Sequence, residues 1–414
     1  MFTSEHLSKN VIKDVLNDLN PQARVMQALS KKEFKKNLHL LSIGKAAWDM
    51  AYAAYAFLGN GLNSGLVVTK YGHSKGKIGP FDIIEAGHPI PDENSLKAGA
   101  YAMKKFAKLG QEDEMLLLIS GGGSALFEVL YGDLTLQDLR MVTQKLMASG
   151  LDIKTINAVR KRLSLVKGGQ FAKTVEPASI QALIISDVIG DTVADIASGP
   201  VTQETYPTDV SDILNKLEID ETPIVQAIQR ELPKNLKNVQ VSIIDNILHA
   251  CQSAKSHFEK QGLQATIITT SLECEAKEAG QFIAAMIKDI YKGNSDFSNP
   301  CCLIFGGETV VTLKGKGKGG RNQELSLSAA IALDGLEADC TLFSLGTDGT
   351  DGPTDAAGGM VTPQTVKQMK ALGINPSQLL QNNDSYHALQ AANALIQTGP
   401  TGTNVNDLIC GVLL

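Results

Sequence analysis

Short apolar runs alternate along this chain with longer segments in which apolar residues recur every three or four positions. In the first half, the runs typical of buried strands span residues 38–43, 65–69, 82–86, 114–120 and 180–186. Amphipathic segments such as SLKAGAYAMKKFAKL lie between them. A second series has strand-like runs at 239–245, 265–270, 300–306, 308–314 and 339–346. This alternation predicts an α/β fold with largely parallel sheets.

The alternation stops around residues 220–237, where two prolines and mixed charge interrupt it. A chain of 414 residues is also too long for one ordinary core. We therefore predict two domains, residues 1–235 and residues 236–414. The helical pattern at 4–29 is compatible with packing on either of them.

Composition narrows the class of protein. The net charge of −6 and the aromatic content of 5% give no basis for nucleic-acid binding. No apolar run approaches the roughly 20 residues of a membrane-spanning helix, and the first residues lack the apolar core of a signal peptide. Six scattered cysteines form no CxxC pair, which argues against a disulfide framework or a zinc site. These features predict a cytoplasmic protein with no nucleic-acid or membrane partner, and they leave a homodimer open.

A glycine turn follows the strand-like run EMLLLIS. It consists of Ser120, Gly121, Gly122, Gly123 and Ser124. Glycines between a strand and a helix let backbone amides approach an anion closely. A nucleophile elbow needs G-x-S-x-G, and Leu126 occupies the last position, which also breaks a dinucleotide fingerprint. We expect an anion cradle, with a plain turn as the alternative.

A second glycine-rich loop, KGKGKGGRNQE, lies between an apolar run and an amphipathic helix. Gly315 and Gly320 have P-loop spacing, but Arg321 and Asn322 replace the lysine and hydroxyl residue that a P-loop requires. Backbone amides, a helix N-terminus and a guanidinium still suit a phosphoryl group. We expect Gly320, Arg321 and Asn322 to bind one. The alternative is a solvated basic loop.

Carboxylates gather at two predicted strand ends. Asp187 follows one strand, with Asp191 four residues later, and such groups beside phosphates are natural Mg²⁺ ligands. Asp348 and Asp351 lie among glycines after another strand, as in a loop that binds a nucleotide or a sugar acid. Helix caps and turns are the alternatives for all four.

Other polar residues carry weaker signals. Lys45 begins a helix, where a cation opposes the helix dipole unless an anion neutralises it, so we expect it to be functional. A loop near the C-terminus includes Thr401 and Asn404, which either cap a ligand or close the domain. A structural role is favoured for His88. One basic segment belongs either to a site or to a charged helix face, and it contains Asn157, Arg160 and Lys167.

Several of these segments together resemble the class II glycerate kinases, whose C-terminal domain is of the MOFRL type. The matching runs include IGKAAWDMA, GHPIPDENS, SGGGSAL, NAVRKRLSLVKGG, SDVIGD, GGETVVTLKGKGKGGRNQE, GTDGTDGPTDAAGG and TGPTGTNVNDL, in the order of the family. The resemblance implies a larger, Rossmann-like, three-layer N-terminal domain and a smaller α/β domain, with the active site in the cleft between them. It adds Gly306, Gly307 and Glu308 to the ligand-binding residues, and it implies that Lys45 and Arg321 are the essential basic pair.

The resemblance also implies ATP- and Mg²⁺-dependent phosphorylation of D-glycerate, usually to 2-phosphoglycerate. Under this hypothesis Asp187 and Asp191 are the metal ligands, and the glycine turn holds a phosphate or a carboxylate. Two alternatives remain. A hydroxypyruvate reductase requires a dinucleotide fingerprint, which the sequence lacks. A non-catalytic sugar-acid-binding protein would explain the glycine loops but not the placement of Lys45 and Arg321.

Overall fold

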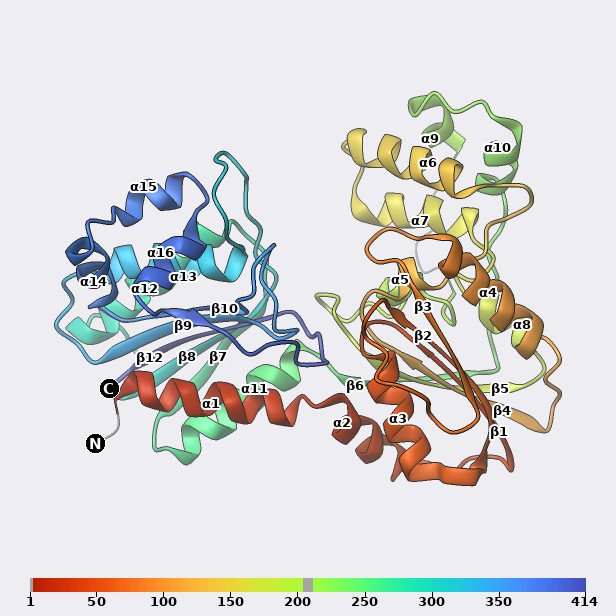
Figure 1. Cartoon of the computed structure of the whole chain (residues 1–414), viewed down its shortest axis with the longest axis horizontal. Coiled ribbons are helices and arrows are strands. Elements are labelled where there is room, and N and C mark those ends of the chain that lie inside the picture. The colour runs from red at the N-terminus through yellow and green to blue at the C-terminus, as the bar shows by residue number, and fades with distance from the viewer. Residues whose placement is uncertain (1–2, 204–210) are drawn as a thin grey trace. The chain divides into compact units, whose positions relative to one another are not determined.

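A computed structural model describes residues 3–203 and 211–414 and divides the chain into two compact units (Figure 1). The N-terminal unit is Pro21–Ile244, and the C-terminal unit combines Met1–Asn20 with Asp245–Leu414. This division differs in two respects from the predicted boundary at residue 235. The strand Val239–Asp245 belongs almost entirely to the N-terminal unit, and the helix Ser4–Asp18 belongs to the C-terminal unit.

A six-stranded sheet forms the centre of the N-terminal unit, in the order β3-β2-β1-β4-β5-β6. All pairings from β3 to β5 are parallel. The strands are β1 (Asn37–Ile43), β2 (Leu62–Lys70), β3 (Phe81–Ala86), β4 (Asp113–Ile119), β5 (Ser179–Ile185) and β6 (Val239–Asp245). The chain first adds strands on one side of β1 and then returns to add β4 on the other side. This reversal is the topological switch point at which open α/β sheets bind their ligands.

Helices cover both faces of this sheet, which confirms the three-layer prediction. One face carries α2 (Pro21–Leu29) and α3 (Ala47–Leu58), and the other carries α4 (Glu93–Phe106) and α8 (Gln170–Val175) (Figure 1). Alternate strand residues such as Leu41 and Leu117 pack against Ala102 and Phe171 in one buried core. Short helical turns complete the layers: η1 (Gly59–Gly61), α5 (Gly123–Leu126) and η2 (Ile196–Ser198).

Four further helices form a separate small core within the same unit. They are α6 (Leu136–Ala148), α7 (Ile153–Leu163), α9 (Ser211–Lys216) and α10 (Thr222–Ile228). Val142, Val159 and Ile228 are among the residues of this core. The proline-containing segment around 220–237 is therefore no simple linker. Pro223 lies in the first turn of α10, where a missing N–H costs nothing.

The C-terminal unit contains a mixed sheet in the order β11-β10-β9-β12-β8-β7. Only β7 and β8 pair in parallel; the other pairings are antiparallel. The strands are β7 (Gln264–Leu272), β8 (Cys301–Gly307), β9 (Cys340–Gly346), β10 (Gly358–Val361), β11 (Leu395–Ile396) and β12 (Asp407–Leu413). The strand predicted at 308–314 is wrong. Its residues form only an isolated bridge, between Val310 and Glu275, because Thr312 and Lys314 donate their N–H groups to side chains.

Helices also cover both faces of this second sheet. One face carries α12 (Ala276–Lys292) and α13 (Arg321–Leu333), with α14 (Thr365–Ala371), α15 (Pro376–Gln381) and α16 (Ser385–Ala391) beside them. The opposite face carries α1 (Ser4–Asp18) and α11 (Ile247–Lys260). Two side-chain contacts fix α1 there: Ser4 Oγ donates to Asp339 at 2.7 Å, and Ser253 Oγ donates to Asp18 at 2.6 Å.

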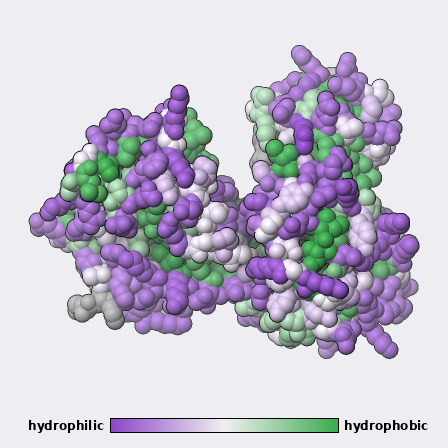
Figure 2. All heavy atoms as spheres, in the orientation of Figure 1, coloured by the Kyte–Doolittle hydropathy of each residue, from purple (hydrophilic) through white to green (hydrophobic). Residues whose placement is uncertain are grey.

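Hydrophilic residues cover most of the surface that Figure 2 shows, with smaller hydrophobic patches between them. None of the helices in the described parts of the chain is long and apolar enough to cross a membrane.

Candidate active site

Lys45 and the glycine turn meet at the switch point of the parallel sheet. Ile43 and Ile119 are register partners at the ends of β1 and β4, so the segments that follow these strands emerge side by side. The Lys45 N–H donates to the Gly121 carbonyl at 2.9 Å. Two segments that the sequence singled out separately therefore form one structure, at the edge where ligands of such sheets bind.

The backbone of this turn needs a glycine at its centre. Gly122 has φ +85°, which residues with a side chain rarely adopt. A Cβ at this position would lie 2.9 Å from Cδ2 of His88 and 3.3 Å from Cγ of Lys45. The missing side chain thus lets two basic residues flank the half-buried Gly122, where an anion could approach the backbone closely.

Four basic side chains gather at this edge. Lys45 follows β1, Lys70 ends β2, His73 comes just after it, and His88 follows β3. The ring Nδ1 of His73 lies 3.2 Å from the Lys45 carbonyl. Burial and, to a smaller extent, the charges of Lys45, Lys70 and His73 together lower the pKa of His88 to about 4. His88 is neutral at pH 7, and the surrounding potential favours an anion.

The structure thus adds Lys70 and His73 to the residues that the sequence singled out, and it places His88 beside them. For His88 the sequence favoured a structural role. The available signal was its position directly after a strand of the parallel sheet, the same position that Lys45 occupies after β1.

The two serines of the turn have structural partners. Ser120 Oγ accepts a hydrogen bond from the Ala46 N–H at 3.0 Å, which ties β4 to the start of α3. Ser124 Oγ lies 2.8 Å from Ser198 Oγ. These contacts give the hydroxyls a role in holding the turn, in agreement with the rejection of a nucleophile elbow.

Asp187 lies on the same edge of the sheet, two residues after β5, which is the neighbour of β4. Asp191 follows in a tight turn with φ +53°, where its N–H donates to the Val188 carbonyl at 3.0 Å. Residues 3–203 and 211–414 contain no group of three histidine, cysteine or acidic side chains that could hold a metal ion. A divalent ion at this edge would therefore be held by one or two carboxylates, as is usual for Mg²⁺ bound with a phosphorylated substrate.

The basic segment comprises the end of α7 and the turn that follows it, and two of its predicted site residues have protein partners. Lys167 is 2% exposed and forms an ion pair with Glu128, which is fully buried. Asn157 Nδ2 donates to Asp195 at 3.4 Å. Burial lowers the pKa of Arg160, and the charge of Glu128 opposes this shift. The ligand role of Lys167 stays a prediction, and a ligand would have to compete with Glu128 for this side chain.

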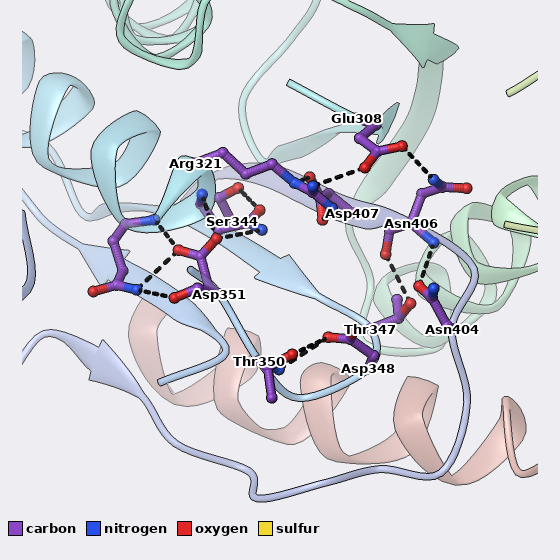
Figure 3. Close-up of polar contacts among 12 residues, drawn as sticks. Glu308, Arg321, Ser344, Thr347, Asp348, Thr350, Asp351, Asn404, Asn406 and Asp407 are labelled. Atoms are coloured by element: carbon purple, nitrogen blue, oxygen red, sulfur yellow. Dashed lines mark hydrogen bonds and ion pairs between the residues drawn. The ribbon is translucent and has the colours of Figure 1, made fainter. Parts of the chain in front are cut away.

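Arg321, the first residue of α13, is held by two carboxylates of the C-terminal unit (Figure 3). Its Nε and Nη2 donate to the carboxylate of Asp407 at 2.6 and 3.0 Å, and its Nη1 donates to Glu308 at 2.7 Å. These residues meet because Asp407 begins β12, opposite Gly307 and Gly346 at the ends of its antiparallel neighbours β8 and β9.

This pairing fixes the charge of the guanidinium. Burial acts to lower the pKa of Arg321, but hydrogen bonds and charge from Asp407, together with Glu308 and Asp351, raise it. Burial raises the pKa of Asp407 to about 6, although Arg321 opposes that shift. Asp407 and Asn406, which donates to Glu308 at 3.1 Å, were not predicted as site residues. Their position in the motif TGPTGTNVNDL was the available signal.

Asp351 is a helix cap. Its carboxylate accepts the backbone N–H groups of Asn322 at 3.2 Å and Gln323 at 2.9 Å, at the start of α13. Gly320 lacks a side chain where a Cβ would clash with this carboxylate. The side chain of Asn322 accepts from Ser344 Oγ at 2.5 Å. Asp351 and Asn322 are thus engaged in positioning α13 and Arg321, which is the alternative that the sequence left open for the aspartate.

In the loop that resembles a P-loop, the backbone N–H groups of residues 314–318 already have protein acceptors, whereas the phosphoryl-binding role expected of Gly320, Arg321 and Asn322 stays a prediction. The N–H groups of Lys314 and Gly315 donate to Asn383 Oδ1 at 2.8 and 2.9 Å. Those of residues 316, 317 and 318 donate to Asn382 and Asp384. A Cβ at Gly315 or Gly317 would clash with Asn382 or Asp384, so the glycines allow close packing of two protein segments.

The remaining predicted residues border the same edge of the second sheet. Gly306 and Gly307 pack against Ile247 and Leu272, where a Cβ would clash. Asp348 Oδ1 accepts from the Thr350 N–H at 3.0 Å and from its hydroxyl at 2.9 Å. The Thr401 hydroxyl donates to the Thr347 carbonyl at 2.6 Å. Asn404 Oδ1 accepts the Asn406 N–H at 3.4 Å (Figure 3).

Two families match this chain. The family described as "Domain of unknown function (DUF4147)" matches residues 7–232, and the MOFRL family matches residues 301–407. A D-glycerate 2-kinase from Thermotoga maritima is 49% identical over 419 residues, with all of each chain covered. A putative hydroxypyruvate reductase from Agrobacterium vitis is 39% identical, covering 89% of this chain and 85% of the relative.

A crystal structure of glycerate kinase from Thermotoga maritima superposes with a TM-score of 0.95 at 49% identity, covering 99% of both chains. The order of strands and the fold of both units therefore agree with an experimental structure. This chain belongs to the class II glycerate kinase family.

Proposed function

We propose that this protein is a glycerate 2-kinase that transfers the terminal phosphoryl group of ATP to D-glycerate. In the proposed reaction the 2-hydroxyl oxygen attacks the γ-phosphorus, the bond from that phosphorus to the bridging oxygen breaks, and ADP and 2-phosphoglycerate result. The hydroxyl proton leaves to solvent or to a carboxylate. Phosphoryl transfer depends mostly on positioning and on stabilisation of charge, which basic side chains and backbone amides supply.

The observation that carries this proposal is the basic cluster around Gly122. Lys45 and His88 flank a glycine at the switch point of a parallel sheet, and Lys70 and His73 add to the positive potential. We propose that this cluster binds the carboxylate of glycerate or the transferring phosphoryl group. Lys45 is its catalytic residue, because it is a flexible cation beside the glycine peptide.

Arg321 is the second catalytic residue of the proposal. Asp407 and Glu308 hold its guanidinium at the edge of the second sheet. Because the side chain is already ordered, binding of a phosphoryl group costs little further conformational entropy. Asp407 is 1% exposed and contacts two guanidinium nitrogens, which makes it the positioning residue for Arg321.

Asp187 and Asp191 lie at the edge of β5 and fit a magnesium ion held by few protein ligands. A bound Mg²⁺ would neutralise part of the negative charge of the phosphate groups. We assign Asp187 as the principal ligand because it follows the strand directly beside β4.

One experiment tests the reaction. Incubation with ATP, Mg²⁺ and D-glycerate should release ADP, and enolase alone should consume the product, since enolase accepts 2-phosphoglycerate and not the 3-isomer. A parallel sample with hydroxypyruvate and NADH should show no loss of NADH. Release of ADP with a product that enolase does not consume would contradict the position of transfer. Oxidation of NADH without release of ADP would contradict the kinase assignment.

A further inference from the structure

The C-terminal unit contains a cavity to which the proposed reaction assigns no ligand. Its volume is about 790 Å³, and Arg321 lines one part of it. The backbone of Gly317, Gly319 and Gly352 forms part of its wall. The segment from Lys314 to Lys318 is fixed by hydrogen bonds to Asn382, Asn383 and Asp384, so this part of the wall is preformed.

Apolar side chains that also line this cavity are exposed to solvent. Val310 is 57% exposed and Leu313 is 78% exposed, in a segment without regular secondary structure. The cavity thus combines exposed aliphatic side chains with a stretch of wall that has no side chains. A planar aromatic ring system suits such a lining, because it can bury apolar area against it.

Thr309 supplies an independent sign of a ligand. It lines the cavity, is only 2% exposed, and its Oγ1 has no hydrogen-bond partner among the residues that the structure describes. A buried hydroxyl without a partner is costly, and such groups are rare unless a ligand or a water satisfies them. The hydroxyl can donate to, or accept from, the edge of a polar ring.

The charges of the cavity limit what it can bind. Several carboxylates line it, and most are engaged: Glu308 pairs with Arg321, Asp351 caps α13, and Glu324 accepts from Asn383 at 3.0 Å. Burial raises the pKa of Glu324, which favours its neutral form. Negative groups of a ligand are therefore disfavoured except near Arg321. A neutral ring system attached to an anionic end fits this distribution.

We propose that this cavity binds the nucleoside part of the phosphoryl donor, with the purine between the glycine wall and Leu313 and the phosphates directed toward Arg321. Thr309 hydrogen-bonds the nucleoside. This inference rests on the proposed function for the identity of the donor, but the cavity itself belongs to the C-terminal unit alone.

Calorimetric titration of the full-length protein with Mg·ADP tests the assignment without any turnover. Leu313→Asp should weaken ADP binding at least tenfold, because it places a charge against the apolar ring. Thr309→Val should weaken it by about 2- to 12-fold, the range expected for one neutral hydrogen bond. Leu372→Asp is the matched control: Leu372 is 63% exposed in the same unit and does not line the cavity, so ADP affinity should not change.

Steady-state kinetics provide the second measurement. Leu313→Asp should raise the KM for ATP and leave kcat and the KM for D-glycerate within about twofold, since uniform binding is lost. Thr309→Val should keep or raise the Tm, because it removes an unpaired buried hydroxyl. Unchanged ADP affinity in Leu313→Asp, or a rise confined to the KM for D-glycerate, would overturn the inference. A wild-type protein that binds ADP in this cavity yet does not phosphorylate glycerate would contradict the proposed function and leave the inference standing.

Discussion

The chain contains two glycine-rich loops that look alike in sequence and differ in what their glycines do. In the turn at 121–123, the missing side chain of Gly122 leaves a peptide between His88 and Lys45. In the loop at 314–320, the glycines allow the chain to pack closely against Asn382 and Asp384, which accept its N–H groups. The first loop lies between two basic side chains, and the second packs against the segment that contains Asn382 and Asp384.

The comparison teaches that a glycine-rich sequence alone does not predict a phosphate site, since the loop's amides must also remain available to an anion. A backbone N–H that already has a good protein acceptor gains little from an anion. The loop at 314–320 instead delivers Gly320 and Arg321 to the start of α13, where Asp351 caps the helix and Asp407 orients the guanidinium. In this loop we expect the side chain of Arg321, and not the N–H groups of residues 314–318, to contact the phosphoryl group, because those N–H groups already have protein acceptors.

Gly122→Val should give the largest effect and abolish turnover. The valine would have to adopt φ +85°, and its Cβ would crowd His88 and Lys45. Ser124→Ala is the matched control, because it removes one hydroxyl contact, worth about 0.5–1.5 kcal/mol or roughly 2- to 12-fold in rate. Circular dichroism should show that both variants are folded. Turnover by Gly122→Val near the wild-type rate would refute the anion site, and a folded but inactive Ser124→Ala would revive a nucleophilic serine.

Lys45→Ala and Arg321→Ala should each lower kcat/KM by at least about 100-fold, roughly 2.7 kcal/mol of transition-state stabilisation. Lys45 lies beside the first loop, to which its N–H is hydrogen-bonded, and Arg321 directly follows the second loop. Urea unfolding provides the control, with midpoints close to that of the wild type expected for Lys45→Ala. If either variant keeps a near-normal kcat/KM, the residue that it replaces is not catalytic.

Asp187→Asn should raise the Mg²⁺ concentration needed for half-maximal rate, because it replaces a charged oxygen ligand by a neutral one of the same shape. The measurement is a magnesium titration at saturating ATP and D-glycerate, with Asp348→Asn as a comparison at the edge of the other sheet. An identical magnesium dependence in Asp187→Asn and the wild type would leave Asp187 without a metal role.

Lys314→Ala and Lys316→Ala should have the smallest effect, with kcat/KM within about twofold of the wild type. Both side chains are exposed, and the backbone N–H groups of these residues already have acceptors in Asn383 and Asn382. A loss of tenfold or more in either variant would show that this loop binds the substrate phosphates after all.

Much of the fold and part of the site follow from local patterns. The strand that precedes Lys45 and the strand that precedes Gly121 are apolar runs, and parallel strands bring their ends together without any long-range information. The acceptors of the second loop could not be predicted in this way. Asn382 and Asn383 lie more than 60 residues farther along the chain and carry no signal of their own.

The same limit explains the other differences. The helical pattern at 4–18 is amphipathic, but only the tertiary contacts of Ser4 and Asp18 assign it to the C-terminal unit. Asp351 looked like a ligand because glycines surround it, whereas its role as a cap depends on α13, whose N-terminus begins 30 positions earlier. His88 gave only the weak signal of following a strand.

The most direct test of the anion site is the titration of His88, followed by NMR of imidazole-labelled protein and assigned with His88→Gln. Without ligand, His88 should titrate with a pKa of about 4, because burial and the nearby cations disfavour its charged form. An anion beside Gly122 stabilises the protonated ring, so 2-phosphoglycerate should move this pKa upward, toward the ordinary value of 6.5. The fraction of protonated His88 at pH 5 should therefore increase on saturation. An unchanged titration of His88 at saturating 2-phosphoglycerate would contradict the assignment of the glycine turn.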